Sequence, residues 1–196
     1  GLPATPRMGP GRQTRRRFPP PTRWGRAALG GKKKPAPETL AALKSLTLQA
    51  KPSATTLYPE AARIQALWAL QSTAIDPSAS LEALTKSPNR NARREAAVSG
   101  LLVALGLLQD PDPEVRFASL GTVGTSLSGI SDNKAAGELL HAMIGNAGAA
   151  LPEPVRPSTH SGKTIKTGAA YEREYERYLV RMFLEAHPDK VSVFLD

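Results

Sequence analysis

The chain of 196 residues has about the length of one domain, and its 40% of hydrophobic residues suffice for a buried core. It contains no cysteine, which excludes disulfide bonds, thiolate metal sites, cysteine nucleophiles and covalent haem attachment through Cys-x-x-Cys-His. Its formal net charge is +9, and aromatic residues make up only 5%. Abundant alanine and leucine with few aromatic residues favour an all-α protein packed through small side chains.

Residues 1–37 are expected to form a disordered basic tail. They contain eight prolines, six glycines and ten basic residues but no acidic residue, whereas the chain from Glu38 onward is close to neutral. The tail shows no hydrophobic periodicity, so it cannot bury enough apolar surface to offset the entropy of ordering. No part of the chain is long and apolar enough to predict a signal peptide or a membrane span.

The tail raises the alternative of nucleic-acid or polyanion binding, through counterion release and stacking on Phe18 and Trp24. The candidate contacts are Arg15, Arg16, Arg17, Arg23, Arg26, Lys32, Lys33 and Lys34. A solvated linker is the interpretation we favour, because nothing in the tail is suited to reading bases.

Between residues 38 and 150, helical segments alternate with short breakers. Apolar residues at Leu40, Leu43 and Leu46 to Leu48 predict a helix within residues 37–50. Residues 60–72 form a wider apolar stripe that includes Trp68, and a stripe of this width predicts burial on more than one side. A helix after Asp76-Pro77 is expected to turn Leu81 and Leu84 inward.

An internal repeat runs through this region. Three copies share a small or β-branched residue, an arginine, two variable residues and a small residue, and their arginines are Arg63, Arg93 and Arg116. A spacing of about 30 residues fits one helix pair, but the second interval is shorter. Residues 97–109 therefore form either a helix with a clipped connector or one long helix bent at Gly100 or Gly106.

The sequence DPDPEV, which begins at Asp110, predicts a tight corner between antiparallel helices. Asp110 ends the preceding helix, the carboxylate of Asp112 caps the next one, and Pro113 suits the first helical position. Glu114 is favoured at the positive end of the helix dipole. Val115 and Ala118 are the first residues expected to enter the core between repeats.

Proline-rich corners followed by Val-Arg-x-x-Ala resemble HEAT repeats of the short bacterial type, over about residues 57–127. The resemblance implies an α-solenoid of antiparallel helix pairs that serves protein–protein interaction or scaffolding, without catalytic activity or a cofactor. In that family the arginine of each repeat pairs with an acid of the corner or of a neighbouring repeat. The resemblance therefore implies structural roles for Arg63, Arg93 and Arg116 in place of an anion site.

A narrower resemblance involves ARIQALWALQ, the DPDPEVRF corner and YERYLVRMFLEAHPDKVSVFL. These stretches are similar to the HEAT-like segment of planctomycete and verrucomicrobial membrane-bound dehydrogenase-type haem proteins. This alternative implies an extracytoplasmic repeat segment with a spacer or docking role. The haem-attachment motif and the strands of a propeller are absent from this sequence, so no functional residue of that family carries over.

The end of the helical region, for which we predict HEAT-like repeats over residues 38–150, is less regular. Residues 131–148 predict another repeat helix, capped by Ser131 or Asp132. Residues 151–168 predict a long surface loop, because prolines and small polar residues break the helical pattern. Residues 161–164 resemble the end of a phosphate-binding loop but lack its first glycine and a preceding strand, so phosphate binding is not expected.

Residues 169–196 carry the strongest amphipathic pattern and predict a helix and cap. Its apolar positions are Tyr171, Tyr175, Tyr178, Leu179, Met182 and Phe183. We interpret this stripe as core, with a partner-binding groove as the alternative. Glu172, Glu174 and Glu176 are expected to form ion pairs on a solvent face, and His187 to mark the helix end.

The sequence contains few residues in patterns typical of catalytic sites. The histidines His141, His160 and His187 are scattered, and neither a Glu-x-x-His pattern nor a nucleophile elbow occurs. We therefore expect no enzyme activity, no metal site and no small-molecule ligand. The function that the sequence favours is binding a protein partner through the helical body.

Overall fold

The computed structural model describes residues 35–49, 59–73 and 76–195, and within these ranges the chain is mostly helical, as predicted. The helices are α2 (Pro37–Leu48), α3 (Pro59–Gln71), α4 (Ser78–Thr85), α5 (Arg90–Ser99), α6 (Leu101–Gly106), α7 (Pro113–Ser126), α8 (Asn133–Ala147), α9 (Gly168–Ala186) and α10 (Pro188–Leu195). A 3₁₀ turn over Leu127–Gly129 follows α7. The predicted tail, apart from its last residues, lies outside the described residues.

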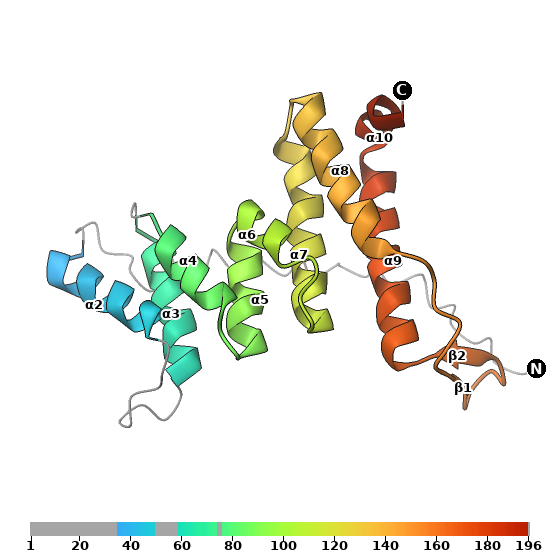
Figure 1. The fold of residues 1–196 in the computed structure, drawn as a ribbon, viewed down its shortest axis with the longest axis horizontal. Coiled ribbons are helices and arrows are strands. Elements are labelled where there is room, and N and C mark those ends of the chain that lie inside the picture. The colour runs from blue at the N-terminus through green and yellow to red at the C-terminus, as the bar shows by residue number, and fades with distance from the viewer. Residues whose placement is uncertain (1–34, 50–58, 74–75, 196) are drawn as a thin grey trace, which may run out of the picture.

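The helices follow one another in chain order along the long axis of the molecule (Figure 1). Helices α3, α5, α7 and α9 lie side by side as one layer, in which each contacts the next. Helices α2, α4 and α6 pack beside this layer, and α8 packs against α7, α9 and α10. Contacts are thus made mainly between near neighbours along the row.

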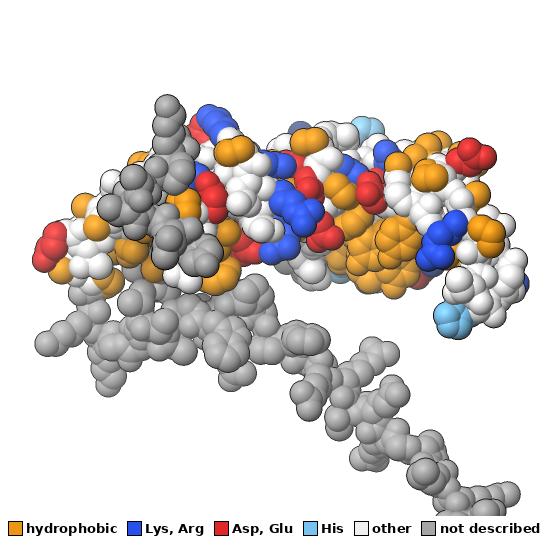
Figure 2. Space-filling view, turned by 90° about the horizontal axis from the view of Figure 1, so that it is seen from below, with side chains coloured by type: hydrophobic (Ala, Val, Ile, Leu, Met, Phe, Trp, Pro, Cys, Tyr) orange, Lys and Arg blue, Asp and Glu red, His pale blue; other side chains and the backbone are white. Residues whose placement is uncertain are grey.

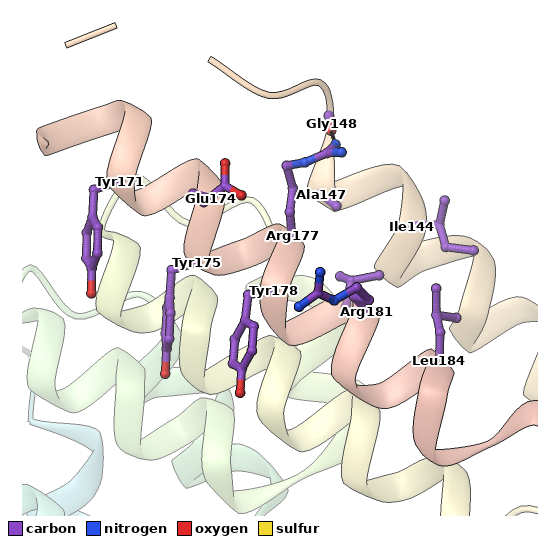
Figure 3. Close-up of a pocket in the computed structure, with 11 residues that line it drawn as sticks. Ile144, Ala147, Gly148, Tyr171, Glu174, Tyr175, Arg177, Tyr178, Arg181 and Leu184 are labelled. Carbon is purple, nitrogen blue, oxygen red and sulfur yellow. Dashed lines mark hydrogen bonds between the residues drawn. The ribbon is translucent and has the colours of Figure 1, made fainter. Parts of the chain in front are cut away.

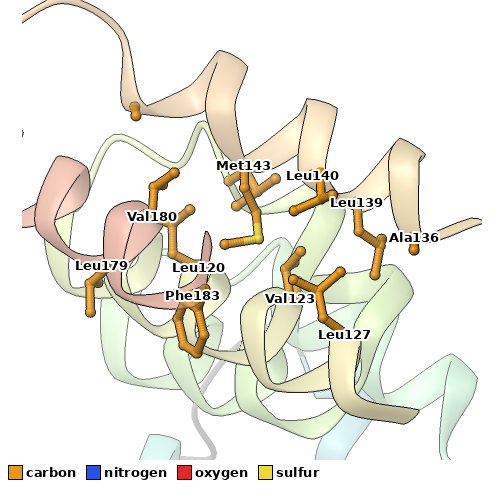
Figure 4. Packing of buried hydrophobic residues seen from close by; sticks show 13 residues of the cluster. Leu120, Val123, Leu127, Ala136, Leu139, Leu140, Met143, Leu179, Val180 and Phe183 are labelled. Carbon is orange, nitrogen blue, oxygen red and sulfur yellow. The ribbon is translucent and has the colours of Figure 1, made fainter. Parts of the chain in front are cut away.

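The core is divided in the same way as the helices. One cluster, between α3, α4 and α5, contains the buried residues Leu67, Leu84 and Ala96. Another, between α5 and α7, contains Ala97 and Val115. The largest cluster joins α7, α8 and α9 (Figure 4). Its fully buried members include Leu120, Val123, Leu127, Leu140 and Met143. Each cluster stabilises the contact between consecutive helix pairs, because apolar area leaves water there.

The corner at Asp110 has the predicted capping geometry. The Asp112 carboxylate accepts a hydrogen bond of 2.9 Å from the Glu114 N–H, and Pro113 is the first residue of α7. Val115 is fully buried. The start of α5 is built alike, since the Asn89 side chain accepts a hydrogen bond from the Asn91 N–H. Of the two residues expected to cap α8, Asp132 is the one that does so.

Residues 97–109 form two helices broken at Gly100. Helix α5 ends at Ser99, Gly100 is extended (φ −170°, ψ 141°), and α6 then runs for only six residues. The connection is therefore a clipped helix and not one long bent helix. A helix of six residues explains why the interval between Arg93 and Arg116 is short.

The predicted loop at residues 151–168 contains a small antiparallel hairpin, which the sequence did not predict. Strand β1 (Val155–Pro157) pairs with β2 (Thr164–Lys166) in a register that places Arg156 opposite Ile165. Gly162 lies in the turn with φ +64°, a conformation that favours glycine. Residues 161–164 lead into β2 and not into a helix, so they lack the geometry of a phosphate-binding loop.

The burial of α9 differs from the predicted pattern. Leu179, Val180 and Phe183 are buried, but the tyrosines of the expected core stripe are exposed. Glu176, expected on a solvent face, has only 1% of its side chain exposed. Trp68 of α3 was likewise expected inside and is 42% exposed. Helical spacing identifies a stripe, but the neighbouring helices decide which edge of it they cover.

Helix α7 approaches α9 through Gly124. A Cβ atom added at Gly124 would overlap the ring of Phe183, whereas one added at Gly121 meets nothing within 4 Å. We predict that Gly124→Ala lowers the free energy of unfolding by about 1–3 kcal/mol through overpacking. Gly121→Ala, the control on the same helix, should raise it by up to about 1 kcal/mol. Urea unfolding of both variants measures the difference, and equal values would contradict the close packing.

Candidate functional site

The guanidinium group of Arg93 joins two corners of the chain. Its Nε and Nη2 donate hydrogen bonds of 2.7 and 3.0 Å to the Asp110 carboxylate at the next corner. Its Nη1 donates to the carbonyl oxygens of Ser87 and Pro88, at 2.8 and 3.2 Å. The planar guanidinium group thereby donates to the carbonyl groups of its own corner and to the carboxylate of the following corner. A lysine side chain cannot make all of these contacts in one geometry.

Arg116 repeats this arrangement one step along the row. Its Nη1 donates to the carbonyl oxygens of Asp110 and Pro111, at 2.9 and 3.1 Å. Its Nε donates a hydrogen bond of 2.6 Å to Glu176 on α9. The carbonyl groups again lie six and five residues before the arginine, and the acid again comes from the next helix of the layer or the corner before it: Asp110 precedes α7, and Glu176 lies on α9.

Arg63 makes a variant of the same contact. Its Nε and Nη2 donate to the Thr47 carbonyl oxygen at the end of α2, at 3.2 and 3.0 Å, and its Nη1 lies 3.2 Å from Glu60 of the same helix. The three arginines are thus occupied by protein groups. They line no common anion site.

Glu176 connects three helices. Its Oε1 accepts the hydrogen bond from Arg116 on α7, and its Oε2 lies 2.9 Å from Nη1 of Arg173. The same Nη1 donates to the carbonyl oxygens of Asn146 and Ala147 at the end of α8. Sequence reasoning missed this role, because the acid is separated from Arg116 by 60 residues.

The carboxyl group of Asp110 is tuned by these contacts. Burial by itself would raise its pKa, but hydrogen bonds from Arg93 and the Asp112 N–H, with the positive charges of Arg93 and Arg116, hold the pKa of Asp110 below its ordinary value. Folding therefore favours the charged form of the Asp110 carboxyl group.

Three tyrosines of α9 form an exposed row, which we call the tyrosine ladder: Tyr171, Tyr175 and Tyr178. They project from one side of the helix as successive rings (Figure 3), with exposed fractions of 58%, 38% and 49%. The first pair of rings is nearly parallel, at an angle of 9° and with centroids 6.5 Å apart. The second pair has an angle of 20° and a separation of 6.1 Å.

Neighbouring side chains hold the ladder in place. Phe117 of α7 packs edge-on against Tyr175, with centroids 4.7 Å apart and an angle of 77°. The guanidinium carbon of Arg181 lies 5.9 Å from the centroid of Tyr178. Seen from below, hydrophobic side chains gather into a patch at the level of α7 and α9 (Figure 2). The ladder is thus an exposed aromatic surface that packs against Phe117 and Arg181.

An open groove of about 730 Å³ adjoins the ladder. Helix α8 contributes Ile144, Ala147 and Gly148, and α9 contributes Val180 and Leu184 together with the tyrosines. A second open groove, of about 720 Å³, lies between α4 and α6, where Leu102 is 84% exposed. The first groove combines apolar walls with aromatic rings and charged side chains, a composition typical of binding sites.

The structure does not bring the histidines together. His141 lies on α8, His160 lies in the turn of the hairpin beside Thr159, and His187 ends α9 with its Nε2 3.5 Å from the Ser128 hydroxyl oxygen. Within the described ranges no group of three histidine, aspartate or glutamate side chains could hold a metal ion. None of the helices described there has the length and apolarity that crossing a membrane requires.

No protein-family model, curated protein or solved structure matches this chain. The resemblances to HEAT repeats and to the dehydrogenase-type segment therefore stay predictions. The basic residues considered for polyanion binding, from Arg15 to Lys34, lie outside the described residues, so that interpretation also stays a prediction.

The Arg93–Asp110 contact offers a direct test of the corners. Arg93→Met should lower the free energy of unfolding by about 3 kcal/mol, because it leaves a buried carboxylate and two carbonyl groups without their donor. Arg90→Met is the matched control: Arg90 is 61% exposed and lies 3.6 Å from Asp112. Its loss should cost less than about 1 kcal/mol in the same urea titration. Equal costs would show that the corner contact is not structural.

Asp110 also predicts a dependence of stability on pH. Since its pKa is lower in the folded state than the value of about 3.9 in the unfolded chain, its contribution is present above about pH 4 and lost as the pH falls further. Asp110→Asn should therefore flatten the decline of the urea midpoint below pH 4. Glu185→Gln, which removes a carboxylate that is 71% exposed, should leave the decline nearly unchanged. A slope that Asp110→Asn does not alter would refute this account.

Proposed function

We propose that this chain is a HEAT-like α-solenoid module that binds another protein through the tyrosine ladder and the adjoining groove. Two consecutive corners with the same arginine contacts support the solenoid. Arg93 and Arg116 each bind their own corner and an acid further along the row, Asp110 before α7 and Glu176 on α9. In stacked repeats each unit buries its apolar face against its neighbours, as the separate core clusters of this chain do.

The observation that carries the binding function is the exposure of the ladder. Three large rings stand in a row, each at least 38% exposed, in a chain where only 5% of the residues are aromatic. Contiguous exposed apolar surface marks interaction sites, and tyrosine is enriched among residues that dominate binding energy. Ordering the rings costs little entropy on binding, because Phe117 and stacking already restrict them.

The chemistry of the ladder suits binding. It offers ring surfaces for apolar contact, hydroxyl groups for hydrogen bonds and the flanking charges of Glu174 and Arg181 for orientation. The helices beneath it are fixed by the Arg116–Glu176 contact and by the large core cluster. The surface is therefore preorganised, and its role in this proposal is recognition without catalysis.

Site-specific photo-crosslinking followed by titration tests the function. A benzoylphenylalanine at position 178 should crosslink a partner that the same group at position 102 does not capture. The purified partner should then bind the Tyr178→Ser variant at least ten-fold more weakly, which corresponds to a loss of about 1.4 kcal/mol. Leu102→Ser, a control on the exposed α6, should change the affinity less than two-fold. A partner whose affinity is the same for both variants would refute a role for the ladder.

A further inference from the structure

The pair of helices α8 and α9 is joined like the pairs before it. Arg93 and Arg116 each donate to carbonyl groups of the corner that precedes their own helix. Arg173 of α9 does the same, since its Nη1 donates hydrogen bonds of 2.8 Å to the carbonyl oxygens of Asn146 and Ala147 at the end of α8. The row of helices therefore continues through α9 without a change in how its units are built.

The groove beside the tyrosine ladder lies on the side of α9 that faces away from α7. Helix α7 contacts the edge of α9 that carries Glu176 and Phe183. Arg177 and Arg181, which line the groove, lie about 100° and 140° around the helix from Glu176, at 100° per residue. Among the described residues, none from α10 lines the groove, since that helix packs mainly against α8. Along the described row, the place of a helix next to α9 is therefore open.

The form of the groove suits a helix. Helices α8 and α9 lie side by side there (Figure 3). The apolar walls are Ile144 and Ala147 of α8 and Val180 and Leu184 of α9. The part of α9 that lines it begins at Glu174 and ends at Leu184, which is about 15 Å at a rise of 1.5 Å per residue. A groove of this length between two helices accepts about three turns of an amphipathic helix, whose apolar anchors recur at spacings of three and four.

Arg177 is the charged side chain of the groove that lacks a carboxylate. Its Nη1 donates a hydrogen bond of 2.6 Å to the carbonyl oxygen of Gly148. Within the described ranges no carboxylate oxygen lies within 4 Å of its guanidinium group, which carries five donors. Arg116, inside the row, receives the carboxylate of Glu176 from the next helix. Arg177 is thus placed to receive a carboxylate from a helix beside α9.

The other charges along the groove are paired. Glu174 accepts a hydrogen bond of 2.7 Å from Lys166, which is the main cause that lowers the pKa of Glu174, and the charges of Arg177 and Arg181 lower it further. Arg181 lies 3.5 Å from Glu185. Three cations therefore face two carboxylates, and the excess favours an acidic partner over a basic one. The two carboxylates and the apolar walls do not suit the phosphates of a nucleic acid.

We propose that the groove between α8 and α9 docks an amphipathic helix of a partner protein, with its apolar face on Ile144 and Leu184 and an acidic side chain on Arg177. The docked helix takes the place of a next helix in the row, and Tyr178 borders it. The inference rests on the proposed binding function, because it names the kind of partner that this surface binds.

Selection from a library of helices tests the chemistry of the partner. The probe is a phage-displayed helical hairpin whose outer helix of about 14 residues spans about four turns. Its apolar positions, at spacings of three and four, vary among leucine, isoleucine, methionine and phenylalanine, and the flanking positions vary among glutamate, glutamine and lysine. Selection against the full chain should enrich helices with a glutamate beside the apolar stripe.

Fluorescence anisotropy titrations of a selected helix then test the contact with Arg177. Arg177→Glu should weaken binding at least about ten-fold, because it places two like charges together. Lys134→Glu, the same change of charge in the exposed first turn of α8, should weaken it less than about two-fold. Replacing the selected glutamate by lysine should restore binding to the Arg177→Glu protein, which also shows that this variant is folded.

The apolar wall has a matched pair of variants. Ile144 lines the groove and is 42% exposed, whereas Val98 on α5 lies outside it and is 44% exposed. Ile144→Ser should weaken binding of the selected helix at least about five-fold, and Val98→Ser less than about two-fold. Equal effects of the two substitutions would place the helix elsewhere on the molecule and overturn the proposal.

Four other results would overturn the proposal. They are the failure of selection to enrich any helix over a library with serine at the apolar positions, enrichment of lysine over glutamate, binding that Arg177→Glu leaves unchanged, and self-association of the full chain that Ile144→Ser abolishes. The last result, from sedimentation velocity, would assign the groove to a second copy. Binding of single-stranded DNA that depends on Arg177, without enrichment of any helix, would make the groove an anion site.

The photo-crosslinked partner separates this inference from the proposed function. If the crosslinked segment of that partner is not an acidic amphipathic helix, but Tyr178→Ser still weakens its binding, only the helix inference falls. If the affinity of the partner is unchanged by Tyr178→Ser, the proposed function of the ladder falls as well.

Discussion

The guanidinium contacts of Arg93 and Arg116 are the interaction on which the rest of the structure depends. Each group lies mostly out of water, with 14% and 19% of its side chain exposed, so its charge must be met by protein groups. The planar guanidinium group donates to two carbonyl groups of the preceding corner and to a carboxylate further along the row. One side chain thereby fixes both the turn before its helix and the position of the next unit.

The same contact determines the surface of the molecule. The contact between Arg116 and Glu176 lies on the buried edge of α9, which also carries Leu179 and Phe183 of the large core cluster. The tyrosines lie about a quarter to a third of a turn away from that edge, at the 100° per residue of an α-helix, and remain exposed. Close packing of Gly124 against Phe183 holds this rotation. The ladder that we propose as a binding surface thus lies on the side of α9 that α7 and α8 leave uncovered.

Sequence reasoning was accurate where the controlling interactions are local. Asp112 and Asp132 cap helices because a carboxylate two residues away accepts the first free N–H groups, and Val115 enters the core one turn after a proline corner. The prediction of burial failed where contacts between residues far apart in the sequence decide which side of a helix is covered. Trp68 and the tyrosines were expected inside, but the helices beside them cover other edges of α3 and α9. The hairpin of β1 and β2 escaped prediction because its strands are three residues each, too short for a periodic signal.

The sequence by itself determined the helical class, the helix boundaries near Pro37, Pro113 and Asp132, and the pairing of prolines with capping residues at the corners. Those features follow from backbone and side-chain preferences within a few residues. Only the tertiary structure decided that Glu176 is buried and that the tyrosine ladder is not. Both follow from contacts with α7 and α8, which are distant in the sequence, and hydrophobic periodicity carries no information about which edge of an amphipathic helix such contacts cover.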